Sequence, residues 1–336
     1  MGVVDISSIV VSSRVRLARN IDKIPMPQRL NAQNGYKVLK LVADSVAGLD
    51  EFKIYTIKQL SFADACVMQE KHLISNDLLE KKEFGAVILN SDETISIMVN
   101  EEDHIREQCF LRGLELERAF ETLNDYDNKM LSKLDVAFDD KFGFLTSCIT
   151  NLGTGMRASV LMFLPALTLS GEINSIINAL QRRGLCVRGV YGESTNFDGY
   201  MYQISNARSL GISEKEIIGL VKETVLRVCE YENRARIKLL ADKEIEITDR
   251  VFRAFGVLCN CYTLTSTELM QLAGEVKMGL ALGLLRLKDS GILDKLITDC
   301  MPYSLSKIAR TNLEGEERDM FRAKYVNGIL KNQRIK

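Results

Sequence analysis

Alternation of apolar and polar side chains marks several β-strands in the first two-thirds of the chain. The clearest is at residues 94–99, where every second residue from Ile95 is apolar and β-branched, as in a strand with one buried face. The apolar run at 85–89 precedes it across a polar turn, so the two segments predict a β-hairpin. Further strands are predicted at residues 9–11, which lead into 12–16, and at 143–146 and 185–188.

Apolar residues spaced by three and four predict helices between and after these strands. Residues 107–123 are expected to form one long helix. The next begins at Ser213, whose side chain can form a capping box with Glu216. It should run to about Leu240, because apolar residues recur behind the box at helical spacing.

The strand signals fade after about residue 243. Thr265 and Glu268 form a second predicted capping box, and an apolar stripe at helical spacing follows it. We therefore expect an α+β fold, with a mixed domain at residues 1–242 and a mainly helical domain at residues 243–336. Such a stripe is usually core packing, and it also suggests self-association.

The composition is that of a globular protein, with 46% hydrophobic and 26% charged residues among 336. The net charge of −1 argues against direct nucleic-acid binding. The longest apolar run, residues 160–167, is short and contains a proline, so no membrane span is expected. Because the N-terminus also shows no signal-peptide pattern, we expect a cytoplasmic protein.

Eight cysteines are spread along the chain without a C-x-x-C pair, and His72 and His104 are the two histidines. This pattern disfavours both a structural zinc site and a disulfide framework. Most of the cysteines are therefore expected to be small core residues, and no dedicated metal-ligand set is predicted.

The densest cluster of reactive side chains is the run NEEDHIR at residues 100–106, directly after the strand predicted at 94–99. Three carboxylates, an imidazole and a guanidinium gather there, and functional groups are common where a strand ends. A solvated turn before a helix would also be acidic, because Asp and Glu favour the first helical turn. The run alone leaves both interpretations open.

The run GTGMRA at residues 153–158 matches the loose G-x-G-x-x-A fingerprint of dinucleotide folds and is expected to lead into a helix. The match is weak, because a long loop separates it from the preceding strand and an arginine lies inside it. The chain has no P-loop motif. A tight glycine turn would still bring backbone N–H groups and Arg157 close to an anion.

Five arginines lie at predicted strand ends or beside glycines. A guanidinium keeps its charge and holds phosphate through a planar fork of N–H donors. Each arginine taken alone is more often a solvated surface residue, but the set favours phosphate binding by a chain that lacks a P-loop lysine. The five are Arg14, Arg16, Arg106, Arg157 and Arg188.

Four motifs, in this order, together resemble the ATP:guanidino phosphotransferases, the family of creatine and arginine kinases and of bacterial protein-arginine kinases. They are SSRVR at 12–16, NEEDHIR at 100–106, CITNLGTGMRAS at 148–159 and RGVYGE at 188–193. The resemblance implies a catalytic domain with an antiparallel β-sheet flanked by helices, followed by the helical domain. It also implies transfer of the γ-phosphoryl group of ATP to a guanidinium, with Mg²⁺ held by phosphates and water.

The resemblance implies roles for individual residues. Glu102 would orient the acceptor guanidinium and take a proton from it, Glu193 would be the second carboxylate of the clamp, and a Cys148 thiolate would help to orient the guanidinium. His72 would lie near the adenine. The implied ATP-binding residues are Ser12, Ser13, Arg14, Val15, Arg16, His72, Arg106, Arg157, Ala158, Ser159, Val160, Leu161, Arg188, Gly189, Val190, Tyr191, Gly192 and Glu193.

Two features resemble the bacterial protein-arginine kinases in particular. Only eleven residues precede Ser12, whereas the phosphagen kinases carry a helical domain there that helps to enclose a small substrate, so an open acceptor side suits a protein substrate. A second resemblance is to the R-D-x-x-R motif that binds phosphoarginine allosterically in those enzymes, although a charged helical face is the alternative explanation. That motif would comprise Arg318, Asp319, Met320, Phe321, Arg322 and Ala323.

The same resemblance implies a homodimer that phosphorylates arginine-bearing proteins. Its implied partners are a heat-shock repressor, a Clp ATPase and protease that degrade the marked proteins, and a zinc-binding activator of the McsA type. The sequence leaves two alternatives open. One is a kinase of free guanidines, as in the phosphagen kinases, and the other is a phosphoarginine-binding regulator with a decayed kinase site.

Overall fold

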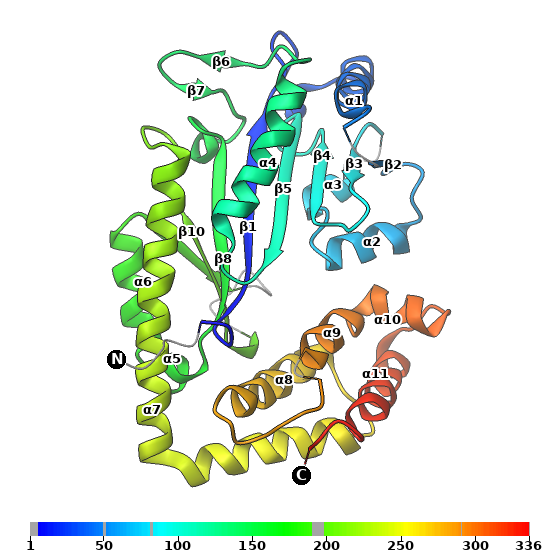
Figure 1. Cartoon of the computed structure of the whole chain (residues 1–336). Coiled ribbons are helices and arrows are strands. Elements are labelled where there is room, and N and C mark those ends of the chain that lie inside the picture. Colours follow the sequence, from blue (N-terminus) through cyan, green and yellow to red (C-terminus); the bar gives the residue numbers. More distant parts are fainter. Residues whose placement is uncertain (1–5, 50–51, 81–82, 190–197, 290, 336) are drawn as a thin grey trace.

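The computed structural model describes residues 6–49, 52–80, 83–189, 198–289 and 291–335. Eight strands form the central sheet, namely β1 (Val10–Arg19), β2 (Lys53–Thr56), β3 (Ala86–Leu89), β4 (Ile95–Val99), β5 (Ile105–Arg112), β8 (Met156–Phe163), β9 (Leu185–Gly189) and β10 (Met201–Asn206). They lie in the order β2-β3-β4-β5-β1-β8-β10-β9, and each neighbouring pair is antiparallel (Figure 1). The predicted antiparallel sheet of an α+β fold is confirmed.

Helices cover one face of this sheet and enclose the main core. They are α1 (Ala32–Val46), α4 (Leu116–Leu131), α5 (Pro165–Leu169), α6 (Ile173–Arg182) and α7 (Glu214–Asn260). The helices α4 and α7 pack on the central strands, α1 packs on α4, and α6 packs on β9. Alternate strand residues point into this layer, as Val15 and Leu17 of β1 do.

The opposite face of the sheet is covered at the β3–β4 end by α2 (Phe62–Glu70) and α3 (Asn76–Glu80). These helices form a small second core with the strands, which includes Leu78, Val87 and Met98. Met98 lies directly opposite Arg106 of β5, so the small core and that arginine share one face. This face therefore continues from an apolar end into a charged centre.

The second part of the chain is helical, as predicted, and it begins inside α7. This helix starts at the predicted capping box of Ser213 and Glu216 and continues far beyond the predicted end near Leu240. Lys243 is non-helical (φ −141°, ψ 32°) and lies at a bend that is visible in Figure 1. The helices that follow are α8 (Ser266–Ala281), α9 (Ile292–Asp299), α10 (Pro302–Ala309) and α11 (Gly315–Leu330). None of the helices in the described ranges is both long and apolar enough to cross a membrane.

The helix predicted at residues 107–123 is wrong in its first half. Residues 105–112 form strand β5, and α4 begins at Leu116. In β5 the side chains of Ile105, Glu107 and Cys109 are buried on the core face, while Arg106 lies on the other. Because a carboxylate occupies one of the core positions, the apolar alternation of a strand is broken in the sequence.

The glycine run leads into a strand and not into the predicted helix. Gly155 has a φ of +66°, and a Cβ there would lie 2.6 Å from the carbonyl oxygen of Ala18, so only glycine allows the tight entry into β8. Without a helix after the glycines, the dinucleotide fingerprint does not apply. The strand predicted at 143–146 is limited to β7 (Gly143–Phe144), which pairs with β6 (Phe138–Asp139).

Candidate functional site

The register of the sheet places all five predicted phosphate-binding arginines on the open face. Arg16 of β1 lies directly opposite Arg157 of β8 and opposite Gln108 of β5. Arg14 and Arg106 are two residues away along their own strands, so their side chains point to the same side. Arg188 of β9 reaches the same face through its partner Gln203 on β10, which lies opposite Leu161 of β8.

The central arginines have few protein partners. The Nε atoms of Arg14, Arg16 and Arg157 are buried and make no hydrogen bond within the described part of the chain. Burial, followed by the charges of neighbouring arginines, lowers the pKa of Arg14 to about 10 and that of Arg16 well below its usual range. Like charges held together in this way make the face a site for an anion.

The carboxylates of the 100–106 run have separate roles. Glu101 accepts two hydrogen bonds from Nη1 of Arg106, at 2.6 and 2.7 Å, and a third from Ser75 Oγ. Burial alone would raise the pKa of Glu101, but the charge of Arg106 and the hydrogen bonds to the carboxylate together outweigh this effect and lower the pKa. Glu101 is therefore a fixed counter-charge that holds Arg106 on the open face.

Asp103 ties the acidic turn to the loop that carries Cys148. It is buried, and its Oδ1 accepts hydrogen bonds from Nδ2 of Asn20 and from the backbone N–H of Ser147, both at 2.7 Å. Asn20 in turn accepts a hydrogen bond from the backbone N–H of His104. The ends of β1 and β4 and the Cys148 loop are thereby locked together, and sequence spacing gave no sign of this network.

Glu102 is the carboxylate of this run that remains available for chemistry. Its side chain is half-buried, and its Oε2 lies 3.4 Å from Nδ2 of Asn151, on the Cys148 loop. Burial raises the pKa of Glu102, the charge of Arg106 opposes this, and the neighbouring carboxylates add to it. A carboxylate of increased basicity beside a cationic face can act as a general base.

Cys148 lies on the same loop, directly before a short 3₁₀ turn at Ile149–Asn151. Its side chain is half-buried, and Sγ lies 3.0 Å from Oγ1 of Thr150. The loop that carries Asn151 against Glu102 therefore also carries the predicted cysteine. Of the eight cysteines, five are buried, which agrees with the prediction that most are core residues.

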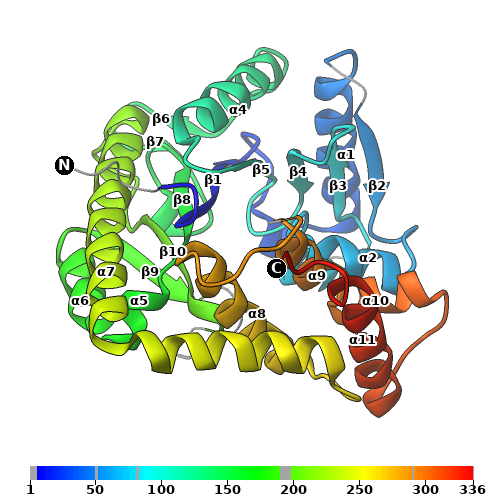
Figure 2. The same cartoon turned by 60° about the horizontal axis from the view of Figure 1, so that its bottom comes forward.

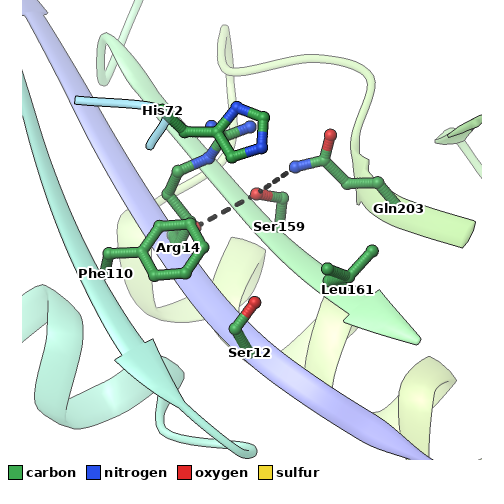
Figure 3. A pocket seen from close by; sticks show the side chains of 7 residues that line it. All are labelled: Ser12, Arg14, His72, Phe110, Ser159, Leu161 and Gln203. Carbon is green, nitrogen blue, oxygen red and sulfur yellow. Dashed lines mark hydrogen bonds between the residues drawn. The ribbon is translucent and has the colours of Figure 1, made fainter. Parts of the chain in front are cut away.

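A pocket of about 150 Å³ opens beside the arginines (Figure 3). His72 lies at its rim, and Nε2 of Gln203 donates a 3.0 Å hydrogen bond to Oγ of Ser159 across it. Desolvation, followed by the charge of Arg14, lowers the pKa of His72, so its ring is neutral near pH 7. The lining residues are Ser12, Arg14, His72, Phe110, Ser159, Leu161 and Gln203.

Five of these pocket residues were among the predicted ATP contacts, whereas Phe110 and Gln203 were not. Phe110 belongs to β5, which was predicted as a helix, and the apolar alternation that would mark this strand is broken at Glu107. Gln203 carries no motif, and only its register opposite Leu161 brings it to the pocket.

Four of the predicted ATP-binding residues point away from this face. Ser13, Val15, Ala158 and Val160 alternate with the pocket residues and are fully buried on the core side of the sheet. Ser13 Oγ instead donates to the carbonyl of Gly113 at 2.7 Å and so helps to fix the start of α4. Because a strand alternates its faces, the side chains of these four residues lie in the core, and their assignment to ATP binding stays a prediction.

The last family motif is described only in part. Arg188 and Gly189 close β9, where Gly189 pairs with Tyr202 of β10. The predicted residues Val190, Tyr191, Gly192 and Glu193 lie outside the described residues.

The motif predicted to bind phosphoarginine lies on α11, where it covers more than one turn. Arg322 is fully buried and donates to the carbonyls of Leu264 and Cys300 and to the carboxylate of Asp319. Ala323 is buried as well and Met320 points outward, so the six residues do not line one pocket. Arg318 and Asp319 share a face with Arg322, and Nε of Arg318 and Nη2 of Arg322 are buried without a described partner.

His104 makes the stability of the fold depend on pH. Its Nδ1 accepts a hydrogen bond from the backbone N–H of Ile21 at 3.0 Å, and Nε2 lies 2.9 Å from the carbonyl of Pro25. A neutral ring with its proton on Nε2 satisfies both contacts, and burial lowers the pKa of His104 against the opposing effects of Pro25 and Asp103. A depressed pKa stabilises the fold above the ordinary value of 6.5, and this stability is lost as the pH falls.

We therefore expect the free energy of unfolding to decrease as the pH is lowered below about 6.5, and to do so less steeply in His104→Gln. Urea unfolding over a series of pH values measures both slopes. His72 also has a lowered pKa, but it is present in both proteins, so the difference in slope reports His104. Equal slopes would contradict the prediction.

Comparisons with known proteins show the family of this chain. Residues 35–235 match the family described as ATP:guanido phosphotransferase, C-terminal catalytic domain, and residues 244–335 match the protein-arginine kinase McsB C-terminal domain. The chain is 44% identical over 324 residues to a protein-arginine kinase of Halothermothrix orenii, which covers 96% of this chain and 93% of that protein. It is 43% identical over 327 residues to a protein-arginine kinase of Caldanaerobacter subterraneus, with 96% and 97% covered.

Among solved structures, a lombricine kinase aligns with a TM-score of 0.61 at 25% identity, over 68% of this chain and 67% of that one. The fold of this chain is thus shared with that kinase. The family match covers well over half of the chain, and the curated relatives span nearly all of it. The chain belongs to the ATP:guanido phosphotransferase family, on its branch of protein-arginine kinases.

Proposed function

We propose that this protein transfers the γ-phosphoryl group of ATP to arginine side chains of other proteins. The observation that carries the proposal is the open face on which Arg14, Arg16 and Arg157 have buried Nε atoms without partners among the described residues. Closely spaced cations of this kind match the polyphosphate of a nucleotide. The basic carboxylate of Glu102, beside that face, can take the proton that an acceptor guanidinium loses.

The acceptor explains why a carboxylate is needed. A guanidinium has no free lone pair and stays protonated at neutral pH, so it must lose a proton as the N–P bond forms. Glu102 would orient the guanidinium in the plane of its carboxylate and accept that proton, and the Cys148 loop would border the acceptor. The arginines would hold the phosphates in line, since positioning and charge compensation dominate phosphoryl transfer. Mg²⁺ would be held by the phosphates and water.

Exposed apolar groups at the acceptor side favour a polypeptide substrate. Ile149, the neighbour of Cys148, is 80% exposed, and Phe138 of the β6–β7 hairpin is 54% exposed. The hairpin joins the Cys148 loop through backbone hydrogen bonds between Phe144 and Gly153. Apolar side chains at the rim of a charged site suit contact with the residues that flank an arginine in a protein. The relatives at 44% and 43% identity are named protein-arginine kinases.

A phosphorylation assay that avoids acid tests this function. The purified protein would be incubated with Mg-ATP and either a model protein or free arginine, and mass spectrometry would locate the phosphate. We expect phosphate on protein arginines and little on free arginine. Phosphate on free arginine alone would point to a phosphagen-type kinase, and phosphate on neither would leave a regulator or a missing activator.

We further propose the cellular role that the resemblance implies. Phosphorylation replaces a positive side chain with an anionic one, which disrupts salt bridges and DNA contacts of the target. Targets would include a heat-shock repressor and proteins passed to a Clp ATPase and protease in the cytoplasm, with an McsA-like activator as partner. The protein would act as a homodimer, and sedimentation at micromolar concentration tests that assembly.

The α11 motif supports a proposal of regulation by phosphoarginine. Replacing Arg318 and Asp319 together with alanine is expected to weaken phosphoarginine binding at least tenfold, because two charged hydrogen-bonding groups are lost. Basal transfer should remain, and titration calorimetry with phosphoarginine measures the effect. Asp319 also binds the buried Arg322, so Arg318→Ala alone provides a variant that keeps this contact. Unchanged binding in both variants would remove the assignment.

A further inference from the structure

The helical domain is attached to the catalytic domain at a place far from the α7 connection. Helix α10 lies against α2 in both views (Figures 1 and 2). The carboxylate of Glu70, the last residue of α2, accepts hydrogen bonds from the backbone N–H groups of Tyr303 and Ser304, both at 2.8 Å, and from Ser304 Oγ at 2.7 Å. One side chain of the catalytic domain thus caps the N-terminus of a helix in the other domain.

Further contacts surround this cap. Lys307 of α10 forms a 2.9 Å ion pair with Asp64 of α2, and the rings of Phe62 and Tyr303 meet edge to face at 5.7 Å. The ion pair is exposed and contributes little. Two of the three hydrogen bonds of Glu70 satisfy helix N–H groups, and all three are accepted by a carboxylate, so they hold α10 on α2 more strongly than the exposed ion pair does.

Glu70 is directly connected to the pocket that His72 and Gln203 line. His72 follows two residues later in a left-handed turn (φ +60°), which is closed by its own N–H bond to the carbonyl of Gln69. The carbonyl of His72 accepts a 2.7 Å hydrogen bond from Gln108 of the central sheet. The backbone between Glu70 and the pocket rim is therefore short and fixed, so a shift of α2 moves His72.

The other side of the pocket is attached to the same domain. Tyr200, directly before β10, donates a 2.5 Å hydrogen bond to Glu275 of α8, which also forms a 2.6 Å ion pair with Arg250 of α7. Strand β10 carries Gln203, which lines the pocket together with His72 (Figure 3). The helical domain is thus joined both to the helix that precedes His72 and to the strand that carries Gln203.

We propose that Glu70 is a positioning residue for the nucleotide, which holds His72 at the pocket by capping α10, so that the helical domain sets the affinity for ATP. The proposal rests on the proposed function only in taking this pocket as the nucleotide site. The cap has no role in the chemistry of transfer. Its loss should therefore raise the Kd and the KM for ATP and leave kcat unchanged.

The test is direct nucleotide binding to full-length variants, measured by calorimetry with ADP and Mg²⁺. Glu70→Ala is expected to raise the Kd about tenfold, since a charged hydrogen-bond acceptor of this kind is lost. Ser304→Ala, which removes one bond from the other domain, should raise it about two- to threefold. Glu121→Gln, an exposed carboxylate on α4, is the control and should leave the Kd unchanged.

A double-mutant cycle with His72 separates positioning from a general structural effect. If Glu70 acts through His72, Glu70→Ala should raise the Kd no further in a His72→Ala background. An unchanged Kd in folded Glu70→Ala, or an equal rise with and without His72, would overturn the proposal. Phosphoarginine formation by the wild-type protein is measured separately, so failure of the proposed function would be recognised on its own.

Discussion

Replacement of Glu102 with glutamine is expected to lower kcat for arginine phosphorylation by about 10²- to 10⁴-fold. The amide keeps the shape of the side chain but cannot take the proton that the acceptor must lose as the N–P bond forms. The proposed nucleotide contacts lie on β1, β8 and the His72 turn, so the Kd for ADP should stay within about twofold. Single-turnover transfer to a model protein and calorimetry with ADP measure the two effects.

The matched control for Glu102 is Asp77→Asn. Asp77 is an exposed carboxylate on α3 whose charge contributes to the raised pKa of Glu102. Its removal changes the field at Glu102 slightly and should leave kcat within about twofold. A folded Glu102→Gln protein that transfers phosphate normally, or one that no longer binds nucleotide, would contradict the role assigned to this residue.

Replacement of Arg19 with methionine is expected to lower the free energy of unfolding by about 3–5 kcal/mol. Arg19 is 3% exposed and donates to Oδ2 of Asp127 through both Nε (3.2 Å) and Nη2 (2.7 Å). Glu107 lies close by, fully buried, and burial together with the charge of Asp127 raises its pKa well above the usual range. The substitution would leave a buried carboxylate pair without its cation, which is the costly way to break a buried ion pair.

Urea unfolding at neutral pH measures this effect, and Arg118→Met, an exposed arginine on α4, is its control. Arg19 also contacts the Cys148 loop of the candidate site, because Nη1 donates to the carbonyl of Thr154 at 3.0 Å and the guanidinium lies 3.6 Å above the ring of Phe144. Transfer should therefore also fall in the fraction of Arg19→Met that remains folded. A loss of stability below about 1 kcal/mol would show that the ion pair is dispensable.

The elements that the sequence predicted correctly are those whose signals are local. The hairpin of β3 and β4 follows from alternation and a polar turn, and the start of α7 follows from a capping box within four residues. The strand β5 was not predicted, because Glu107 occupies a core position. A carboxyl group at this position is explained only by its neighbours in the folded chain, Arg19 and Asp127. The ion pair joins residues 108 positions apart, a distance over which a single sequence carries no readable pattern.

In the candidate site, too, the local motifs could be predicted and the contacts between distant residues could not. The motifs identified Arg14, Arg16 and Arg157 as a set, but the common face on which they lie depends on strand register, which no motif records. For the same reason the motif could not separate Arg14 from Val15, whose side chain points into the core. The role of Asp103 depends on contacts with Asn20 and Ser147, so it became visible only when the chain was folded.

Helix α7 is bent at Lys243 but contains no loop, so the rotation of the second domain about the helix axis depends on the number of residues between the two domains. The two family matches end at residue 235 and begin at residue 244, both inside this helix. One residue inserted into an α-helix rotates everything after it by about 100° and advances it by about 1.5 Å. A flexible linker would absorb such a change, whereas here it would turn α8 away from Tyr200 and α10 away from Glu70 together. The length of this connection is therefore as restricted as that of a strand in the core.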